Sequence, residues 1–307
     1  MQIQNFKQLL SAARKRGPKR VALAVSQDEA ALAALIEAQK LGIAEARLFG
    51  DRAKTQSLLK KLHARPDDFL QLRHLAHETL AAEEAVLAIR MKEADILLKG
   101  KVHTSTFLRW VLHREQGLRT EQRLLSDVFI FENPSRRVGS NQLVMITDGG
   151  ITPAPTLEQK VEILQNAVAV AHRLGNKNPR VAVLSAVETV TPALPSTIDA
   201  ALIAKMNERG QITGCVVDGP LALDNAVSAQ AAKTKGLASG VAGNADILVC
   251  PNIESANLLA KSTTYFAGFR LAHVIMGATA PVLIPSRSDT ADAKLLSIAL
   301  GVLTCEN

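Results

Sequence analysis

The chain has 307 residues, of which 47% are hydrophobic and 3% aromatic, and its formal net charge is +7. A chain of this length is too long for one core of average size, so we expect two domains. No apolar run reaches the about 20 residues that span a bilayer, and the basic start lacks the apolar centre of a signal peptide. We therefore expect a soluble, cytoplasmic protein without a membrane partner, whose first 20 residues form a surface helix rather than a transit peptide.

The positive charge is concentrated in the first half of the chain. Residues 1–140 hold 24 Lys and Arg against 16 Asp and Glu, whereas residues 141–307 hold 12 against 13. A basic half suits nucleic acid or a small ligand with several phosphates, and a merely solvated basic surface is the alternative. Because the cations do not alternate with aromatic residues and no recognition motif is visible, we expect no nucleic-acid partner. The three cysteines are too far apart for a zinc motif, and two of them lie in apolar runs typical of buried thiols.

Short β-branched runs alternate with longer amphipathic stretches along the whole chain, which predicts an α/β fold built from parallel βαβ units. The expected strands are 20–26, 45–50, 94–100, 127–132, 142–148, 180–186, 212–219, 245–250, 272–278 and 281–286. The expected helices include 28–41, 80–93, 155–175, 197–209, 223–234 and 252–268, with a last helix after residue 286. The Pro, Gly and Ser residues of "ENPSRRVGSN" (132–141) indicate a domain boundary where the charge balance changes.

Polar residues gather where expected strands end, which is where ligands bind in an open parallel sheet. In "KGKVHTSTFLR", Lys99, His103, Thr104 and Arg109 surround a helix start, a natural site for an anion. The alternative is that Thr104 or Ser105 is only the N-cap and that the lysines are solvated.

Two other strand ends carry an aspartate. Asp148 precedes a Gly-Gly turn as either a turn former or a cleft residue, and Thr156 with Gln159 forms a capping-box pattern. Asp218 begins "DGPLALDNA", which ordinary turn chemistry also explains.

The stretch "PSRSDTADAK" (285–294) precedes the last helix. A purely structural interpretation makes Ser288 or Asp289 the N-cap and puts Asp292 in the first turn, where its charge favours the helix dipole. This leaves Ser286 and Arg287 unexplained. No P-loop, dinucleotide fingerprint, G-x-S-x-G or H-E-x-x-H motif occurs, and the histidines do not cluster, so no metal site is expected.

Several long motifs, read together, resemble the phosphate acetyl/butyryl transferase family over roughly residues 90–307. They are "LLKGKVHTSTFLR", "ITDGGITPAPTLEQK", "AVLSAVETVTPALPSTIDAALIAKM", "VVDGPLALDNAVS", "GVAGNADILVCPNIESANLLAK" and "LIPSRSDTADAKLLSIAL". "DGPLALDNA" and "SRSD" are more similar to the phosphotransbutyrylase branch than to the longer phosphotransacetylases.

The resemblance implies reversible transfer of an acetyl or butyryl group: acyl-CoA + phosphate ⇌ acyl phosphate + CoA. It implies two α/β domains with the active site in a cleft between them, as in isocitrate and isopropylmalate dehydrogenases. Because the chain would return to its first domain, we expect domains of residues 1–138 plus 284–307 and of residues 139–283. CoA or acyl-CoA and phosphate or acyl phosphate would be substrates, with no metal or redox cofactor and with a homo-oligomeric assembly.

The resemblance also suggests roles for the residues of the last strand end. Arg287 would hold the phosphate bidentately and Ser286 would donate a hydrogen bond to the reacting group. The CoA thiol, whose pKa is about 8.5, needs a base, and Asp292 is preferred over Asp289. Arg109 matches a family position for phosphate or CoA.

The remaining substrate-binding candidates are Lys99, His103, Thr104 and Asp218. The catalytic acid of the acetyltransferases follows the Ser-Arg pair a little further along than either aspartate here, and glycine stands near "ITDGG" where those enzymes often carry cysteine. Two other functions stay open: a decarboxylating dehydrogenase of the same architecture, and a catalytically inactive CoA- or anion-binding regulatory protein.

Overall fold

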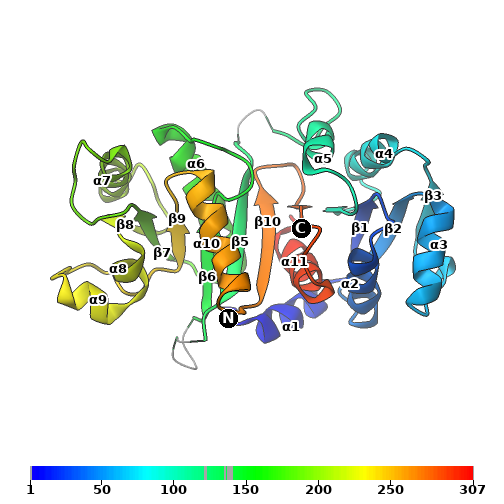
Figure 1. Ribbon diagram of the computed structural model, residues 1–307, viewed down its shortest axis with the longest axis horizontal. Coiled ribbons are helices and arrows are strands. Elements are labelled where there is room, and N and C mark those ends of the chain that lie inside the picture. Colours follow the sequence, from blue (N-terminus) through cyan, green and yellow to red (C-terminus); the bar gives the residue numbers. More distant parts are fainter. Residues whose placement is uncertain (1, 121–122, 135, 137–140, 307) are drawn as a thin grey trace. The chain divides into compact units, whose positions relative to one another are not determined.

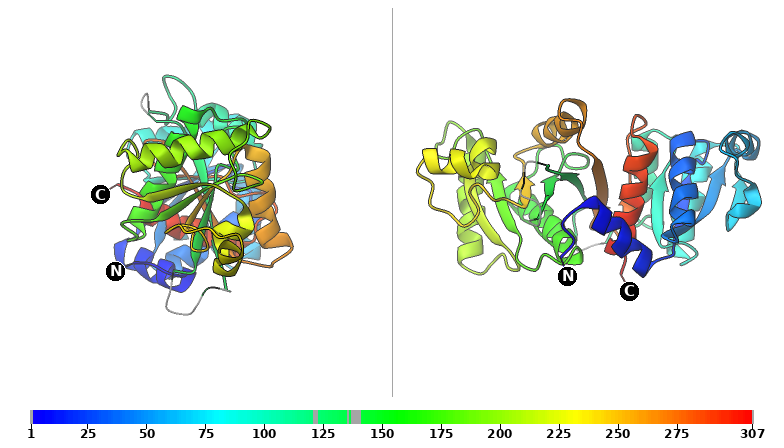
Figure 2. Two further views of the ribbon diagram at one scale, coloured as in Figure 1. Left: turned by 90° about the vertical axis from the view of Figure 1, so that its left-hand side faces the viewer. Right: turned by 90° about the horizontal axis from the view of Figure 1, so that it is seen from below.

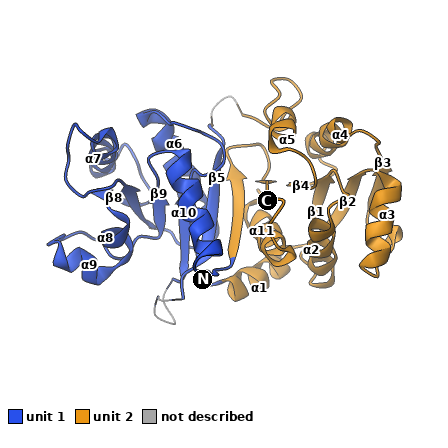
Figure 3. Ribbon diagram, viewed as in Figure 1, with its two compact units in different colours: residues 1–5, 124–270 blue, residues 6–123, 271–307 orange. Residues whose placement is uncertain are grey.

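The computed structural model describes residues 2–120, 123–134, 136 and 141–306. The chain forms two compact units, one of residues 6–123 with 271–307 and one of residues 1–5 with 124–270 (Figure 3). These units divide earlier along the chain than the domains expected with boundaries at 138 and 284. The expected break at 132–141 lies partly outside the described residues.

The first of these units is built on a mainly parallel sheet. Its strands follow the order β3 (Gln71–His74), β2 (Ala44–Gly50), β1 (Lys19–Ala24), β4 (Ile96–Lys99), β11 (Val282–Leu283) and β10 (Leu271–Met276). All neighbours are parallel except β10, which runs antiparallel to β11. Because β4 and β11 are parallel neighbours, the segments that follow them emerge at the same edge of the sheet.

Helices cover this sheet and complete its core. They are α1 (Phe6–Arg16), α2 (Glu29–Lys40), α3 (Arg52–Lys61), α4 (Glu78–Arg90), α5 (Thr104–Val111) and α11 (Ala291–Thr304), with a short 3₁₀ turn at Pro66–Asp68. Residues 294–304 of α11 are all buried, as expected of a helix that is apolar on every side. It packs against α1, α2, β10 and β11, and Figure 2 (right) shows it in red beside the blue helices.

The second unit also consists of strands flanked by helices (Figure 1). Its strands follow the order β5 (Ser126–Glu132), β6 (Leu143–Thr147), β9 (Ile247–Val249), β7 (Arg180–Leu184) and β8 (Val216–Leu221). Its helices are α6 (Leu157–Arg173), α7 (Pro195–Glu208), α8 (Leu223–Val227), α9 (Ala229–Thr234) and α10 (Ile253–Tyr265). Thr156 caps α6 and Gln159 closes the capping box, as predicted.

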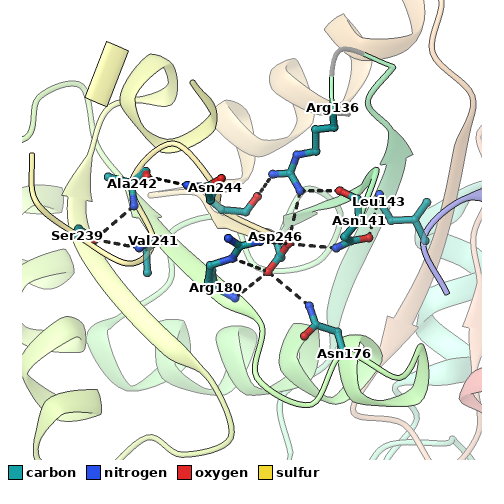
Figure 4. Close-up of polar contacts among 11 residues, drawn as sticks. Arg136, Asn141, Leu143, Asn176, Arg180, Ser239, Val241, Ala242, Asn244 and Asp246 are labelled. Atoms are coloured by element: carbon teal, nitrogen blue, oxygen red, sulfur yellow. Dashed lines mark hydrogen bonds and ion pairs between the residues drawn. The ribbon is translucent and has the colours of Figure 1, made fainter. Parts of the chain in front are cut away.

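A buried carboxylate, Asp246, ties this second unit together (Figure 4). Its Oδ1 accepts from Asn141 at 3.1 Å and from Arg136 at 3.4 Å, and its Oδ2 accepts from the Arg180 Nε at 3.2 Å. Asn176 adds a fourth donor at 3.4 Å, and the exposed fraction of Asp246 is only 4%. The charge of Asp246 is therefore neutralised entirely within the chain.

The predicted α/β class with mainly parallel strands is confirmed, and two strands are antiparallel exceptions that the sequence pattern did not reveal. β5 is antiparallel to β6, and β10 is antiparallel to β11. A parallel connection needs a crossover of a dozen or more residues, whereas residues 133–142 and 277–281 are too short to supply one. The edge strand β3 was missed because its residues are polar and partly exposed.

All three cysteines are buried thiols, which confirms the prediction made for Cys215 and Cys250. Burial raises the pKa of Cys215 to about 11 and that of Cys250 to about 12. None of the helices in the part of the chain that the structure describes has the length and apolar character that crossing a membrane takes.

Candidate active site

The segment that follows β11 is a closed loop that presents Ser286 and Arg287. The Asp289 carboxylate accepts the backbone N–H of Ser286 at 2.7 Å, and the Asp289 N–H donates to the Ser286 carbonyl at 3.1 Å. The hydroxyls of Ser286 and Ser288 lie 2.9 Å apart. These bonds fix the loop while the Arg287 side chain stays exposed. Asp289 is thus used to shape the loop.

Helix α11 begins directly after this loop, with an N-cap that the sequence analysis assigned to the wrong residue. Neither Ser288 nor Asp289 caps the helix; Thr290 does, by accepting the N–H of Ala293 at 3.2 Å. The Asp289 carboxylate cannot cap because it is already bonded to Ser286. Asp292 lies in the first helical turn, as predicted, and it is exposed.

Lys99 lies beneath the loop at the end of β4. Its exposed fraction is 2%, and its Nζ donates to the carbonyls of Pro285 at 3.4 Å and of Gly100 at 3.3 Å. Burial, followed by the positive charges of Lys294 and Arg287, lowers the pKa of Lys99 from 10.5 to about 8. That shift corresponds to a cost of about 3 kcal/mol for keeping Lys99 charged in the folded protein. Two long hydrogen bonds to carbonyls do not supply the negative charge that a buried ammonium ordinarily has beside it.

A second buried lysine, Lys294, stands in α11 close by. Its exposed fraction is 1%, and its Nζ lies 3.0 Å from Oδ2 and 3.2 Å from Oδ1 of Asp28. Asp28 also caps α2 by accepting the N–H of Ala31. Because Asp28 is paired with Lys294, its negative charge offsets only part of the lowering of the Lys99 pKa.

Counting Lys99 and the four charged groups that act on it, the balance of charge is positive. Lys99, Lys294 and Arg287 contribute three cations, and Asp28 and Asp289 contribute two carboxylates, of which Asp289 is bonded to the loop backbone. The buried imidazole of His273 lies 4.0 Å from Asp289. A site with buried, incompletely neutralised cations and an exposed guanidinium can bind an anion such as a phosphate.

The structure thus brings together Ser286, Arg287, Asp289 and Lys99, but it leaves other predicted site residues elsewhere. His103 is the N-cap of α5, although its side chain makes no capping bond, and this corrects the assignment of the cap to Thr104 or Ser105. His103, Thr104 and Arg109 are all exposed, and no contact recorded among the described residues joins Arg109 to the loop.

Asp218 belongs to the other compact unit. It lies in β8 and accepts the N–H of Gly219 at 2.8 Å, beside Lys205 and Glu208 at a shallow pocket. Asp148 acts as a turn former, one of the two roles that the sequence allowed: it accepts four backbone N–H groups, those of Asp127, Gly150, Ile151 and Thr152.

Sequence reasoning missed Asp28 and Lys294, which are separated by 266 positions. The available signal was a single lysine at the start of the apolar run "KLLSIALGVL", and an aspartate just after the first strand. Each is ordinary alone, and only the packing of α11 against α2 makes them a pair.

Comparison with known proteins identifies the family. The family model described as phosphate acetyl/butaryl transferase matches residues 73–302. The chain belongs to this family. It is 44% identical to a phosphate butyryltransferase of Clostridium beijerinckii over 97% of each chain, and 42% identical to that of Clostridium acetobutylicum over 99% of each. A branched-chain phosphotransacylase from Enterococcus faecalis V583 has a similar structure, with a TM-score of 0.81 and 30% identity over 93% of this chain and 98% of that one.

Proposed function

We propose that the protein transfers a short acyl group, acetyl or butyryl, between CoA and inorganic phosphate. Family membership supports this reaction, and one observation on the chain itself carries the placement of the phosphate. Lys99 is buried beneath the loop that presents Arg287, and no carboxylate of the described residues forms an ion pair with it. A phosphate bound there would supply the missing negative charge.

The transfer can be written with the residues of this loop. When CoA attacks an acyl phosphate, the thiol loses its proton, the sulfur–carbon bond forms, and the bond between the acyl carbon and the phosphate oxygen breaks. Arg287 holds the departing phosphate, and the Ser286 hydroxyl donates to the acyl oxygen as its charge grows. No electrons are gained or lost overall, so the transfer as written requires no redox cofactor.

Asp292 takes the thiol proton in this proposal. It is exposed in the first turn of α11, directly after the loop that presents Arg287. The Asp289 carboxylate accepts the Ser286 N–H and shapes that loop. We expect Asp292→Asn to lower kcat about 100-fold or more with little change in KM for phosphate. Asp289→Asn, which loosens the loop, should mainly raise that KM. If the two variants exchanged these effects, the base would be Asp289.

The decisive experiment is thioester formation from CoA and either acetyl phosphate or butyryl phosphate. The wild-type protein should form thioester, and Arg287→Ala should lower kcat/KM about 10²- to 10³-fold. Arg209→Ala, at an exposed arginine that ends α7, is the matched control and should behave as wild type. CoA binding without any thioester would identify the inactive regulatory alternative, and reduction of a nicotinamide cofactor would identify the dehydrogenase.

Three further expectations belong to this proposal. The active site would lie in a cleft between two domains, as in the isocitrate dehydrogenase type, and Arg109, His103, Thr104 and Asp218 would bind substrate, Arg109 through phosphate or CoA. The protein would work in the cytoplasm as a homo-oligomer. All three stay predictions of the family resemblance.

A further inference from the structure

A cavity of about 590 Å³ opens at the other edge of the sheet that carries the candidate site. Its lining includes Lys19, where β1 begins, Asp95, just before β4, and Pro281, just before β11. The loop with Arg287 follows the opposite end of β11. We call this feature the basic cavity; it is separated from the candidate active site by the length of the strands.

The lining of the basic cavity is predominantly positive. Five of its residues are cationic, namely Lys19, Arg20, Arg90, Lys92 and Arg119, and two are acidic, Asp95 and Glu306. The net charge of the lining is therefore five minus two, or +3. A volume of this size is within the range of sites for small molecules.

One of the carboxylates is fully engaged. Asp95 makes a two-point ion pair with Arg20, with Nε to Oδ2 at 3.1 Å and Nη2 to Oδ1 at 2.7 Å, and it also accepts the Arg20 backbone N–H. This arrangement lowers the pKa of Asp95 against the opposing effect of burial. Across the described residues, no carboxylate within ion-pair distance is recorded for Lys19, Lys92 or Arg119.

The negative ends of two helices reduce the positive charge of the lining but do not cancel it. α4 and α11 both end at the basic cavity, and the carboxyl end of a helix carries about half a negative charge. The last turn of α11 is already met by Arg16, which donates to the carbonyls of Leu303 at 3.0 Å and Cys305 at 2.6 Å. Two helix ends contribute about −1, which leaves the lining at about +2.

Hydrogen bonds hold two of the cationic residues, Arg90 and Arg119, in place at the basic cavity. Arg119 forms a β-bridge with Ala278, and the neighbouring Leu118 carbonyl accepts the Thr279 N–H at 2.8 Å. The Arg90 guanidinium donates to the Gly117 carbonyl at 3.1 Å, and this hydrogen bond fixes its orientation in the lining. A preorganised guanidinium binds an anion with less loss of side-chain entropy.

We propose that the basic cavity binds a small phosphorylated molecule carrying at least two negative charges. Its guanidinium groups match the geometry of phosphate oxygens, and the surplus charge of the lining matches a dianion or trianion. This site is distinct from the proposed phosphate position at Arg287, so its existence does not depend on the proposed acyl transfer.

The test is calorimetric titration with inorganic pyrophosphate, carried out on the Arg287→Ala variant so that the candidate active site does not contribute. We expect one saturable site per chain. Lys92→Asn combined with Arg119→Gln should raise its Kd at least tenfold; asparagine is chosen because Lys92 has a φ of 56°, a left-handed conformation that asparagine tolerates. The two single variants should each raise the Kd by a smaller factor.

The matched control removes the same charge elsewhere. Lys233→Asn combined with Lys261→Gln changes two exposed lysines of α9 and α10 and should leave the Kd unchanged. The proposal is overturned if pyrophosphate shows no saturable binding, if the control variant weakens binding equally, or if the Lys92 and Arg119 variants, folded as judged by their thermal midpoints, bind as before. Tighter binding of citrate than of pyrophosphate would overturn the assignment to a phosphorylated ligand.

Discussion

Asp246 and Lys99 are both buried charges, but the chain treats them in opposite ways. Asp246 is surrounded by two arginines and two asparagines, so its charge is neutralised within its own unit (Figure 4). Among the described residues, the Lys99 ammonium has two hydrogen-bond acceptors, carbonyl oxygens at 3.3 and 3.4 Å. A buried charge that the fold satisfies completely stabilises the fold, whereas one left partly unsatisfied is prepared for an outside partner.

Removing the satisfied charge should produce the largest change in stability. Asp246→Asn leaves Arg136 and Arg180 without their counter-charge and should lower the free energy of unfolding by about 3 kcal/mol or more. Denaturant and thermal midpoints measure this loss. The kcat/KM of the folded fraction should be unchanged, and Asp67→Asn, at an exposed carboxylate, is the control. An active-site role for Asp246 would show itself as lost turnover in protein that is still folded.

Removing the unsatisfied charge of Lys99 should change substrate binding and leave the stability of the fold unchanged or higher. Lys99→Met keeps the shape of the side chain, ends the cost of burying an ammonium, and should therefore not lower the thermal midpoint. It should raise KM for phosphate about tenfold or more, since hydrogen bonds to charged groups contribute about 1.5–3 kcal/mol. Lys101→Met, two positions along and exposed, should behave as wild type. A lower midpoint with an unchanged KM would make Lys99 a structural residue.

The smallest effect is expected in the pH dependence. The lowered pKa of Lys99 means that its charged form costs stability below pH about 8, a cost relieved as pH rises from about 8 towards 10.5. Phosphate favours the charged form, so its binding should weaken several-fold as pH rises above about 8. The ratio of KM values for Lys99→Met and wild type should fall towards one over this range. A ratio that is constant with pH would contradict the assignment.

The sequence alone was sufficient for the α/β class, most strands and the loop around Arg287. The strand runs are aliphatic and the loop residues stand at a strand end, which local patterns reveal. It was insufficient for the antiparallel strands β5 and β10, because direction depends on how connections pack, and for the cap of α11, because Asp289 is bonded across its loop to Ser286.

Contacts between distant parts of the sequence were beyond local reasoning. Lys99 and Pro285 meet only because β4 and β11 are neighbours, and Asp28 meets Lys294 only because α11 packs beside α2. The importance of Lys99 follows from how few partners it has, which is visible only once its surroundings are known.

The interleaving of the two units along the chain constrains how the protein is made. β11 lies between β4 and β10, and residues 294–304 of α11 are buried in the core, yet β10, β11 and α11 all follow residues 124–270 of the other unit in the sequence. During synthesis the segment 6–123 therefore leaves the ribosome without β10, β11 and α11, which follow only after about 150 further residues, made at roughly 5–20 residues per second. Until then the apolar faces of β4 and α2 are uncovered, and neither Arg287 nor the ion pair of Asp28 can be in place. Chaperone binding to nascent chains should accordingly persist until residue 304 has emerged.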